Sequence, residues 1–480
     1  MVYSPGNALS ILIFLFWIPI AIWGARRWPP AKAGMLLMLL PLMFLPELVT
    51  VNLPGLPTLG KAEFAKIIML LGVLLFHRQR LASISLPRWS RVVILMLLGG
   101  TVLTVFTNMD PIPHPGSKLL GHQPFDAVTA SLKDVLDYVL PFVLGLALFR
   151  DARDIRTLFG SLAGATIIYG LFQLVEVRLS PQFNNWVYGY FQHSWEQMVR
   201  DGGFRPIVFM AHGLTVAMFT MTGILSSAVL QKIKLPVFGK KAVWATSFLF
   251  VVLVLNKSVA ALLYSIAGTL LIFFFTPKTQ LRAAVVMAVI VLSYPTLRSA
   301  DLVPVDTVSE VMTEQFGKER GRSLMVRITN EKLLLGRALE RPLFGWGTYG
   351  RPLLYDPETG RQLSIPDGEW IVTLGKSGFV GFYAKFLLLL IPLFVAARQS
   401  KYLLNDTHRR LLAGLALIIG FSAFDMVPNS DAYRLPFMYS GALLSASTAM
   451  MRYAARQRRL RREAVIQRRA LDPPRQGAPA

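Results

Sequence analysis

Long apolar segments recur along almost the whole chain, and they constrain its fold more than any other feature. A helix needs about 20 mostly apolar residues to cross a bilayer. Only 16% of the 480 residues are charged, against about 25% in soluble domains. We therefore expect an all-α, polytopic membrane helix bundle with about 12–14 spans. The segments that predict these spans are 8–24, 34–50, 62–76, 91–107, 126–149, 157–177, 208–229, 242–256, 259–276, 281–298, 378–397, 411–427 and 435–451.

The positions of the basic residues indicate how the chain lies in the membrane. The net charge is +23, and 29 Lys and Arg residues but only five Asp and Glu occur in every second connection and in the C-terminal tail. Cytoplasmic loops carry such an excess, so we expect these segments in the cytoplasm and the uncharged N-terminus outside. The charge then needs no nucleic-acid partner, and the tail is expected to lie on anionic membrane lipids. The basic segments are 26–32, 78–91, 150–156, 232–241, 278–282, 398–410 and 452–480.

One long break interrupts the apolar pattern, at residues 299–377. It holds eleven acidic and ten basic residues, so we expect a large loop on the outer side. Within it, residues 325–341 have helical periodicity, which predicts an amphipathic helix lying over the outer membrane face. The loop divides the chain into helices within 1–298 and three more within 378–451, followed by the basic tail, 452–480.

Ionisable residues inside or beside the predicted spans lie toward the outer side. Charge in a bilayer is costly, so each is a functional candidate; for Lys133 and Asp137, spaced i,i+4, the alternative is mutual neutralisation. Guanidinium groups pair two phosphate oxygens, and carboxylates accept protons from hydroxyls. The outer loops contain no DxD motif or histidine cluster, and the chain has no cysteine, so we expect no metal or other cofactor. The candidates for an outward cavity are Lys133, Asp137, Arg205, Lys257, Arg327, Asp367, Glu369 and Asp425.

Four segments resemble motifs of the O-antigen ligase and polymerase superfamily. The segment 327–347, R-ITNEKLLLGRALER-PLFGWG, resembles the signature of an arginine, an amphipathic helix and P-L-x-G-x-G in a large periplasmic loop. GFRPIVFMAHGLTVAMF (203–219) resembles an earlier loop-to-helix arginine motif, and LNKSVAALLYS (255–265) is similar to a serine-containing segment at the start of a span. IPDGEWIVTLGKSGFVG (365–381) resembles the H-N-x-Y-L-x-x-L-x-x-x-G-x-x-G element.

The resemblance covers nearly the whole chain and implies a metal-independent glycosyltransferase of the bacterial inner membrane, with its N-terminus in the periplasm. Such a protein acts on undecaprenyl-diphosphate-linked glycan at the periplasmic face, and a chain-length regulator or export machinery is an implied partner. The resemblance implies that Arg205 and Arg327 hold the donor diphosphate. Asp367 and Gly368 stand where ligases have histidine and asparagine. We therefore favour polymerisation of lipid-linked repeat units, with Asp367 and Glu369 as the acids that contact or activate the acceptor hydroxyl.

Simpler interpretations of the same residues stay open. Arg205 is alternatively an interfacial anchor, Arg327 and Glu331 a surface ion pair, and Asp367 a turn residue. At the level of function, the alternatives are a ligase that transfers glycan to a lipid or protein acceptor and, in a different class, a transporter or flippase. Transporters often contain paired repeats with broken helices; no repeat is visible in this sequence, and the large outer loop favours an enzyme.

Overall fold

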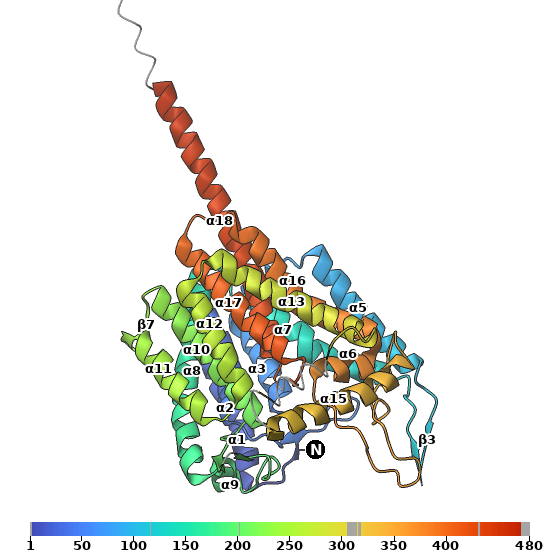
Figure 1. Ribbon diagram of the computed structural model, residues 1–480. Coiled ribbons are helices and arrows are strands. Elements are labelled where there is room, and N and C mark those ends of the chain that lie inside the picture. The colour runs from blue at the N-terminus through green and yellow to red at the C-terminus, as the bar shows by residue number, and fades with distance from the viewer. Residues whose placement is uncertain are drawn as a thin grey trace, which may run out of the picture.

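Uninterrupted apolar segments favour helices in a membrane, because a helix satisfies its own backbone hydrogen bonds. The computed structural model describes residues 2–115, 117–200, 202–304, 314, 318–430 and 433–471, and within these the chain is a helical bundle (Figure 1). Its helices are α1 (Ala8–Arg27), α2 (Pro30–Phe44), α3 (Lys61–Phe76), α4 (Arg78–Ala82), α5 (Arg88–Phe106), α6 (Asp126–Asp134), the π-helical turn η1 (Val135–Val139), α7 (Leu140–Leu148), α8 (Ala152–Leu179), α9 (Phe183–Tyr188), α10 (Gly213–Lys232), α11 (Ala242–Leu255), α12 (Val259–Phe274), α13 (Pro277–Ser299), α15 (Lys318–Leu339), α16 (Glu369–Ser400), α17 (Asp406–Asp425) and α18 (Leu435–Leu471).

The described strands are short and lie at the N-terminus and in the connections between helices. Each described sheet is a two-stranded antiparallel hairpin. The pairs are β1 (Val2–Tyr3) with β2 (Thr50–Val51), β3 (Ile112–His114) with β4 (Ser117–Leu119), β5 (Val199–Arg200) with β6 (Gly203–Phe204), and β7 (Pro236–Val237) with β8 (Lys240–Lys241).

Every predicted span overlaps one or more of these helices; the segment 126–149 is the continuous run of α6, η1 and α7. Among the described helices, six are long and apolar enough to cross a membrane: α1, α5, α8, α10, α13 and α16. The shorter apolar helices α2, α11 and α12 accompany them. This composition is compatible with a multi-pass helical membrane protein, as predicted. The total number of crossings and the orientation stay predictions.

The centre of the bundle is formed by α17. Every residue from 411 to 423 is buried, and α17 packs against α10, α13 and α18. Beside it, α7 and α18 approach closely through glycines: a Cβ at Gly145 would lie 2.1 Å from the Met438 carbonyl oxygen, and one at Gly441 would lie 2.0 Å from the Phe142 carbonyl oxygen. Small residues permit such backbone contact between membrane helices.

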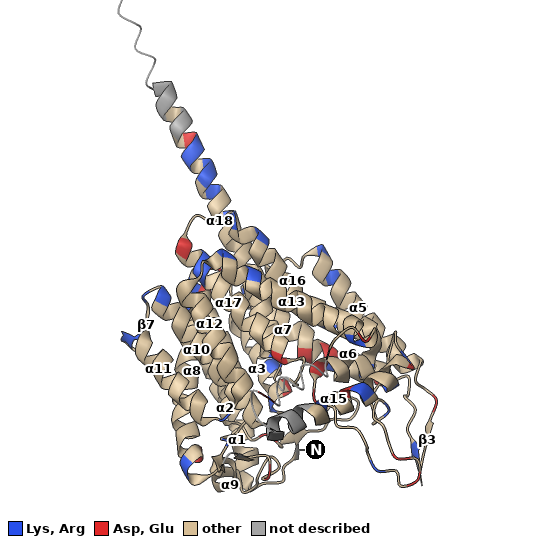
Figure 2. Ribbon diagram, viewed as in Figure 1, with Lys and Arg blue, Asp and Glu red and all other residues tan. Residues whose placement is uncertain are grey.

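The two ends of the bundle differ in charge. Figure 2 shows Lys and Arg gathered at the end from which α18 projects, as expected from the alternating basic connections. We call this the basic end. The opposite end, which we call the loop end, carries the long connections, including the β3–β4 hairpin and α9 (Figure 1).

The amphipathic helix predicted over 325–341 is present as α15, which begins earlier, at Lys318, and ends at Leu339. It lies across the loop end (Figure 1) and packs against α16. Leu334, Leu335 and Ala338 are buried, whereas Leu333 is exposed. One apolar stripe therefore holds the helix against the bundle.

The segment after α15, residues 342–350, docks on a break in α16, and we call it the glycine loop. At Gly378 the helix is interrupted, with φ +62°. The Trp346 N–H group donates to the Gly375 carbonyl at 2.8 Å. Gly345 also has positive φ, and a Cβ there would lie 2.6 Å from the Gly378 nitrogen. The two glycines thus let two backbones touch, which fixes the direction of residues 369–377 relative to the rest of α16.

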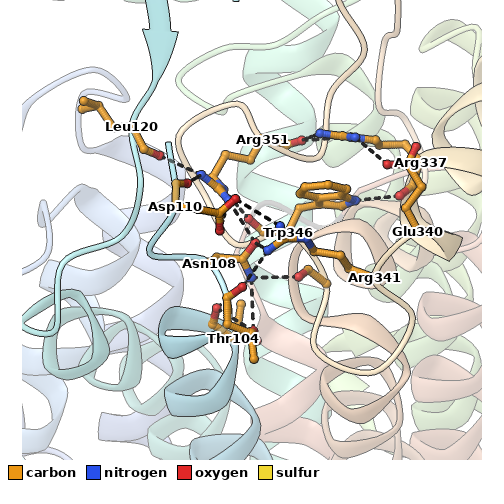
Figure 3. A network of polar contacts seen from close by, with 11 residues as sticks. Thr104, Asn108, Asp110, Leu120, Arg337, Glu340, Arg341, Trp346 and Arg351 are labelled. Carbon is orange, nitrogen blue, oxygen red and sulfur yellow. Dashed lines mark hydrogen bonds and ion pairs between the residues drawn. The ribbon is translucent and has the colours of Figure 1, made fainter. Parts of the chain in front are cut away.

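A buried arginine fastens the end of the glycine loop to the segment that follows α5 (Figure 3). Arg351 is fully buried; its Nη1 donates to the Asp110 carbonyl at 2.6 Å, and its Nη2 donates to Asn108 Oδ1 at 3.2 Å. Arg341 donates to the same Asn108 oxygen at 2.7 Å, and its guanidinium lies 4.2 Å from the Trp346 ring centre. The network anchors the segment that follows α15 and so positions the helix itself.

Candidate functional site

Three of the predicted site residues lie around one opening at the loop end. Arg205, Arg327 and Asp367 line a cleft of about 600 Å³, which we call the polar cleft. They come from three distant parts of the chain: the loop before α10, helix α15, and the residue before the N-cap of α16. The other polar side chains of its wall belong to Glu196, Gln197, His212, Thr215, Asn429 and Ser430.

Arg327 and Asp367 face each other across the cleft wall. Arg327 Nε lies 3.5 Å from Asp367 Oδ2, and the two side chains are 38% and 41% exposed. An ion pair this exposed contributes at most about 1 kcal/mol, so an anionic ligand can displace the carboxylate at small cost. The alternative pairing of Arg327 with Glu331 is wrong, because Glu331 accepts from Arg298 Nε at 2.8 Å.

Arg205 is a buried part of the wall, only 4% exposed. Its Nη2 donates to the Lys257 carbonyl at 3.4 Å, and its side chain lies across the first residue of α10. A Cβ at Gly213 would stand 2.2 Å from Arg205 Cδ. Gly213 therefore provides the space that the arginine occupies, and the arginine faces the polar cleft instead of serving as a lipid-facing anchor.

A buried carboxylate holds the loop that carries Arg205. Glu176 Oε2 accepts from the backbone N–H groups of Ile207 at 2.9 Å and Val208 at 2.7 Å. Its Oε1 accepts from the Phe183 N–H group at 3.0 Å. Val208 has positive φ, so these bonds stabilise an uncommon backbone conformation just before α10. The sequence gives no signal of this role, since Glu176 stands alone near the end of a predicted span.

The N-terminus of α10 also opens onto the polar cleft. His212 is its N-cap: Nδ1 accepts from the Leu214 N–H group at 2.9 Å, and Nε2 lies 3.2 Å from Gln197 Oε1, so Nε2 carries the proton. Helix N-termini attract anions through partial positive charge and free N–H groups. Together with Arg205 and Arg327, the α10 terminus makes this side of the cleft electropositive.

Glu369 does not line the polar cleft, although it was predicted to act with Asp367. It is 2% exposed and forms ion pairs with Arg434 Nη1 at 2.9 Å and Lys385 Nζ at 3.4 Å. Ser430, a cleft residue, donates to Glu369 Oε2 at 2.8 Å. Because Glu369 starts α16, its side chain turns into the bundle beneath the cleft. Through its bond to Ser430, Glu369 holds the part of the bundle beneath the cleft in place, and we call this part the cleft floor.

Lys133 and Asp137, predicted as possible cavity lining, do not line the polar cleft either. Lys133 Nζ contacts Glu63 and lies 3.2 Å from Asp137, which also accepts from Lys66 Nζ at 2.8 Å. This is the mutual neutralisation that i,i+4 spacing allows. We call these four side chains the charge network.

Lys257 and Asp425, the remaining candidates, lie next to the cleft. Lys257 joins α11 to α12 with φ +54°, and its carbonyl receives the Arg205 guanidinium. Asp425 accepts from Asn429 Nδ2 at 3.0 Å. Neither is among the residues that line the polar cleft. Asp425 lines a second space that adjoins it, and cavity lining by Lys257 stays a prediction.

That second space is a mostly apolar chamber adjoining the polar cleft. It lies between α2, α10, α17 and α18, and its apolar wall includes Leu39, Met43, Met218 and Phe219. Leu214, Thr215, Asn429 and Ser430 line both spaces. The arrangement thus places an ionic cleft directly beside an apolar one.

Sequence reasoning missed several cleft residues, among them His212, Asn429 and Ser430. Isolated polar residues near helix ends carry no pattern, and only packing brings them together.

Among the described residues, no group of three or more His, Asp or Glu side chains is placed to hold a metal ion. Comparison with known protein families and with curated protein sequences gave no match to this chain. The relation to the O-antigen ligase and polymerase superfamily therefore stays a prediction from the four motifs.

Proposed function

We propose that the protein is a glycosyltransferase of the bacterial inner membrane that polymerises lipid-linked oligosaccharide repeat units, with its loop end in the periplasm. The observation that carries this proposal is the pairing of two spaces: a polar cleft with Arg205, Arg327 and Asp367, and an apolar chamber beside it. A lipid-linked diphosphate combines the same two chemistries in one molecule.

In the proposed complex, the donor diphosphate lies between the two arginines. Arg205 and the N-terminus of α10 bind one side of it, and Arg327 exchanges Asp367 for a phosphate oxygen. The first part of the lipid chain enters the apolar chamber. The guanidinium groups then stabilise the negative charge that develops on the leaving diphosphate.

Release from Arg327 gives Asp367 its catalytic role. Its carboxylate accepts the proton of the acceptor sugar hydroxyl, and the hydroxyl oxygen bonds to the anomeric carbon of the donor. The bond between that carbon and the diphosphate oxygen breaks, and the lipid diphosphate leaves with the electron pair. One glycosidic bond forms, one glycosyl–phosphate bond breaks, and the proton stays on Asp367 until water removes it.

Transport is the second candidate, and two observations favour it. Lys66 and Asp137 of the charge network are buried in the bundle, and ionisable groups there are typical of ion pathways. Helix α16 is interrupted at Gly378, as helices of transporters often are. Against it, the charge network lines none of the described cavities that border the polar cleft.

A deletion strain complemented with variants tests the proposal. Loss of polymerisation leaves single repeat units on the lipid carrier, and Arg327→Ala or Asp367→Asn should reproduce that loss. Arg361→Ala and Glu358→Gln are matched controls, because both residues are exposed in the same loop and outside the polar cleft. Accumulation of long lipid-linked polymer would instead support a ligase, and unaltered polymer length in both cleft variants would refute the site.

A further inference from the structure

A second cleft, unrelated to the polar cleft, lies at the basic end. It measures about 710 Å³ and is enclosed by the end of α10, the connection between α12 and α13, and the connection between α16 and α17. We call it the basic-end cleft. Its charged side chains are Lys232, Lys278, Lys401, Asp406, Arg409 and Arg410.

Most of the positive charge in this cleft has no counter-charge. Asp406 pairs with Arg410 at 2.6 Å. Lys232 Nζ donates to the Phe273 carbonyl at 2.7 Å, and Arg409 donates to the Leu403 carbonyl at 2.6 Å, but carbonyls leave a cation's charge in place. Within the described chain, four of the five cations make no ion pair with a carboxylate. Such concentrated charge in a concave site attracts anions.

Two helix N-termini add to the attraction. α13 begins at Pro277 after the N-cap Thr276, and α17 begins at Asp406. Thr276, Pro277 and Asp406 all line the basic-end cleft, so the partial positive charges of both helices lie at its wall. The cations and the helix ends are independent features that favour the same kind of ligand.

The rim of the cleft is apolar on one side. Phe274 and Phe275, at the end of the apolar helix α12, are 77% and 49% exposed and line the cleft together with the cations. A small soluble anion would make no favourable apolar contact with these two exposed aromatic rings. A molecule with an anionic head and hydrocarbon chains fits both parts.

We propose that the basic-end cleft is a discrete binding site for an anionic phospholipid, and that its preferred ligand carries two phosphates. Basic pockets between membrane helices on the cytoplasmic side bind such headgroups. Four uncompensated cations exceed the charge of a single phosphodiester, and the cleft has room for two. Lys278, Lys401 and Arg409 contact the phosphates, while the acyl chains run past Phe274 along α12. This proposal is independent of the proposed enzymatic function.

Native mass spectrometry of the purified full-length protein tests the site. The protein is titrated with diphosphatidylglycerol, phosphatidylglycerol and phosphatidylcholine, and bound lipid is counted. Lys278→Ala/Lys401→Ala removes two exposed lysines that hold no helix in place. The matched control, Lys240→Ala/Lys241→Ala, removes the same charge from the exposed β8 strand, outside the cleft.

The site predicts one tightly retained diphosphatidylglycerol per protein, with weaker phosphatidylglycerol and no specific phosphatidylcholine. The cleft variant should weaken diphosphatidylglycerol binding by about fivefold for each lysine, or roughly 25-fold together, and the control variant should change it less than about twofold. Equal weakening in both variants would mean diffuse attraction and would overturn the proposal. Inorganic pyrophosphate that binds the cleft as tightly as the lipid would overturn it as well, since the apolar rim would then have no role.

Discussion

Replacing Gly213 by alanine should disable Arg205 without altering the arginine itself. Gly213 is the first residue of α10, and an added Cβ would lie 2.2 Å from Arg205 Cδ and 2.5 Å from its Cγ. Non-bonded carbon atoms need about 3.5–4.0 Å. The side chain must therefore move by about 1.3 Å or more, and because the contact falls on the stem, the whole guanidinium group is displaced from the cleft wall.

The expected loss of rate follows from the hydrogen bond that Arg205 donates to the donor diphosphate in the proposed complex. A hydrogen bond to a charged group contributes about 1.5–3 kcal/mol, which corresponds to about 10–150-fold in the rate of glycan transfer. Overpacking of this kind costs about 1–3 kcal/mol of stability. A variant that stays folded but transfers glycan far more slowly is therefore expected.

The assay is a double-mutant cycle on purified protein supplied with lipid-linked repeat units. Elongation rates are compared for Gly213→Ala, Arg205→Ala and the double variant, with thermal unfolding measured in parallel. Gly99→Ala is the control, because that glycine lies within α5 with no atom within 4 Å of the added Cβ. In the Arg205→Ala background, Gly213→Ala should slow the rate by less than about twofold. A loss of the same size in both backgrounds would show that Gly213 acts independently of Arg205, contrary to this prediction.

Three further predictions concern stability, each measured by thermal unfolding in detergent. Gly345→Ala should lower the free energy of unfolding by about 2–4 kcal/mol, because Gly345 has positive φ and its backbone contacts the α16 break. Gly336→Ala is the control: it lies in open space on α15 and should be neutral or stabilising by up to about 1 kcal/mol. Equal effects of the two substitutions would contradict the contact between the glycine loop and α16. Burial lowers the pKa of His122 below its ordinary 6.5, and its Nε2 accepts from a glycine-loop N–H group at 3.0 Å, so the neutral ring stabilises the fold. That contribution is complete above pH 6.5 and declines as pH falls below it, and the melting temperature of the wild type should fall more steeply with acid than that of His122→Gln. Glu369→Gln should cost about 3–5 kcal/mol of the free energy of unfolding, because this buried carboxylate loses its ion pairs with Arg434 and Lys385. Asp367→Asn should change stability by less than about 1 kcal/mol, and the reverse order would contradict the assignment of Glu369 to the cleft floor and Asp367 to the cleft wall.

The helices were predictable from the sequence because a span needs length and apolar composition, and both are visible in one dimension. All thirteen predicted segments overlap helices, and the amphipathic helix within 299–377 is present as α15. The break at Gly378 was not predicted. It depends on the glycine loop, whose contact with α16 is a property of the folded chain.

The candidate site was predictable in part, for reasons that particular residues make clear. Arg327 and Asp367 lie on an amphipathic helix and in a loop, where polar side chains usually face water, and both are partly exposed. Arg205 is buried, and it was predicted from its motif. Glu369 is two residues from Asp367, but it starts a helix, and the helix turns it inward to Arg434. The direction in which a helical side chain faces depends on the packing of neighbouring helices, which cannot be derived from the sequence of that helix.

The basic end illustrates the same limit. Its lysines and arginines were predicted as a topology signal, and that prediction needed only their number in each connection. The structure brings those of three connections around one cleft. Charge counts indicate the side of the membrane, but only packing makes a binding site from them.

The central claim is that the polar cleft joins one lipid-linked repeat unit to another, and product length tests it most directly. Purified protein in lipid nanodiscs is given a single lipid-linked repeat unit as both donor and acceptor, and the products are separated by gel electrophoresis. We expect a ladder of increasing length from the wild type and from Arg361→Ala, and only single units from Arg327→Ala and from Asp367→Asn. A ladder of equal length from both cleft variants, or vesicle uptake of the substrate with no glycan product from the wild type, would contradict it.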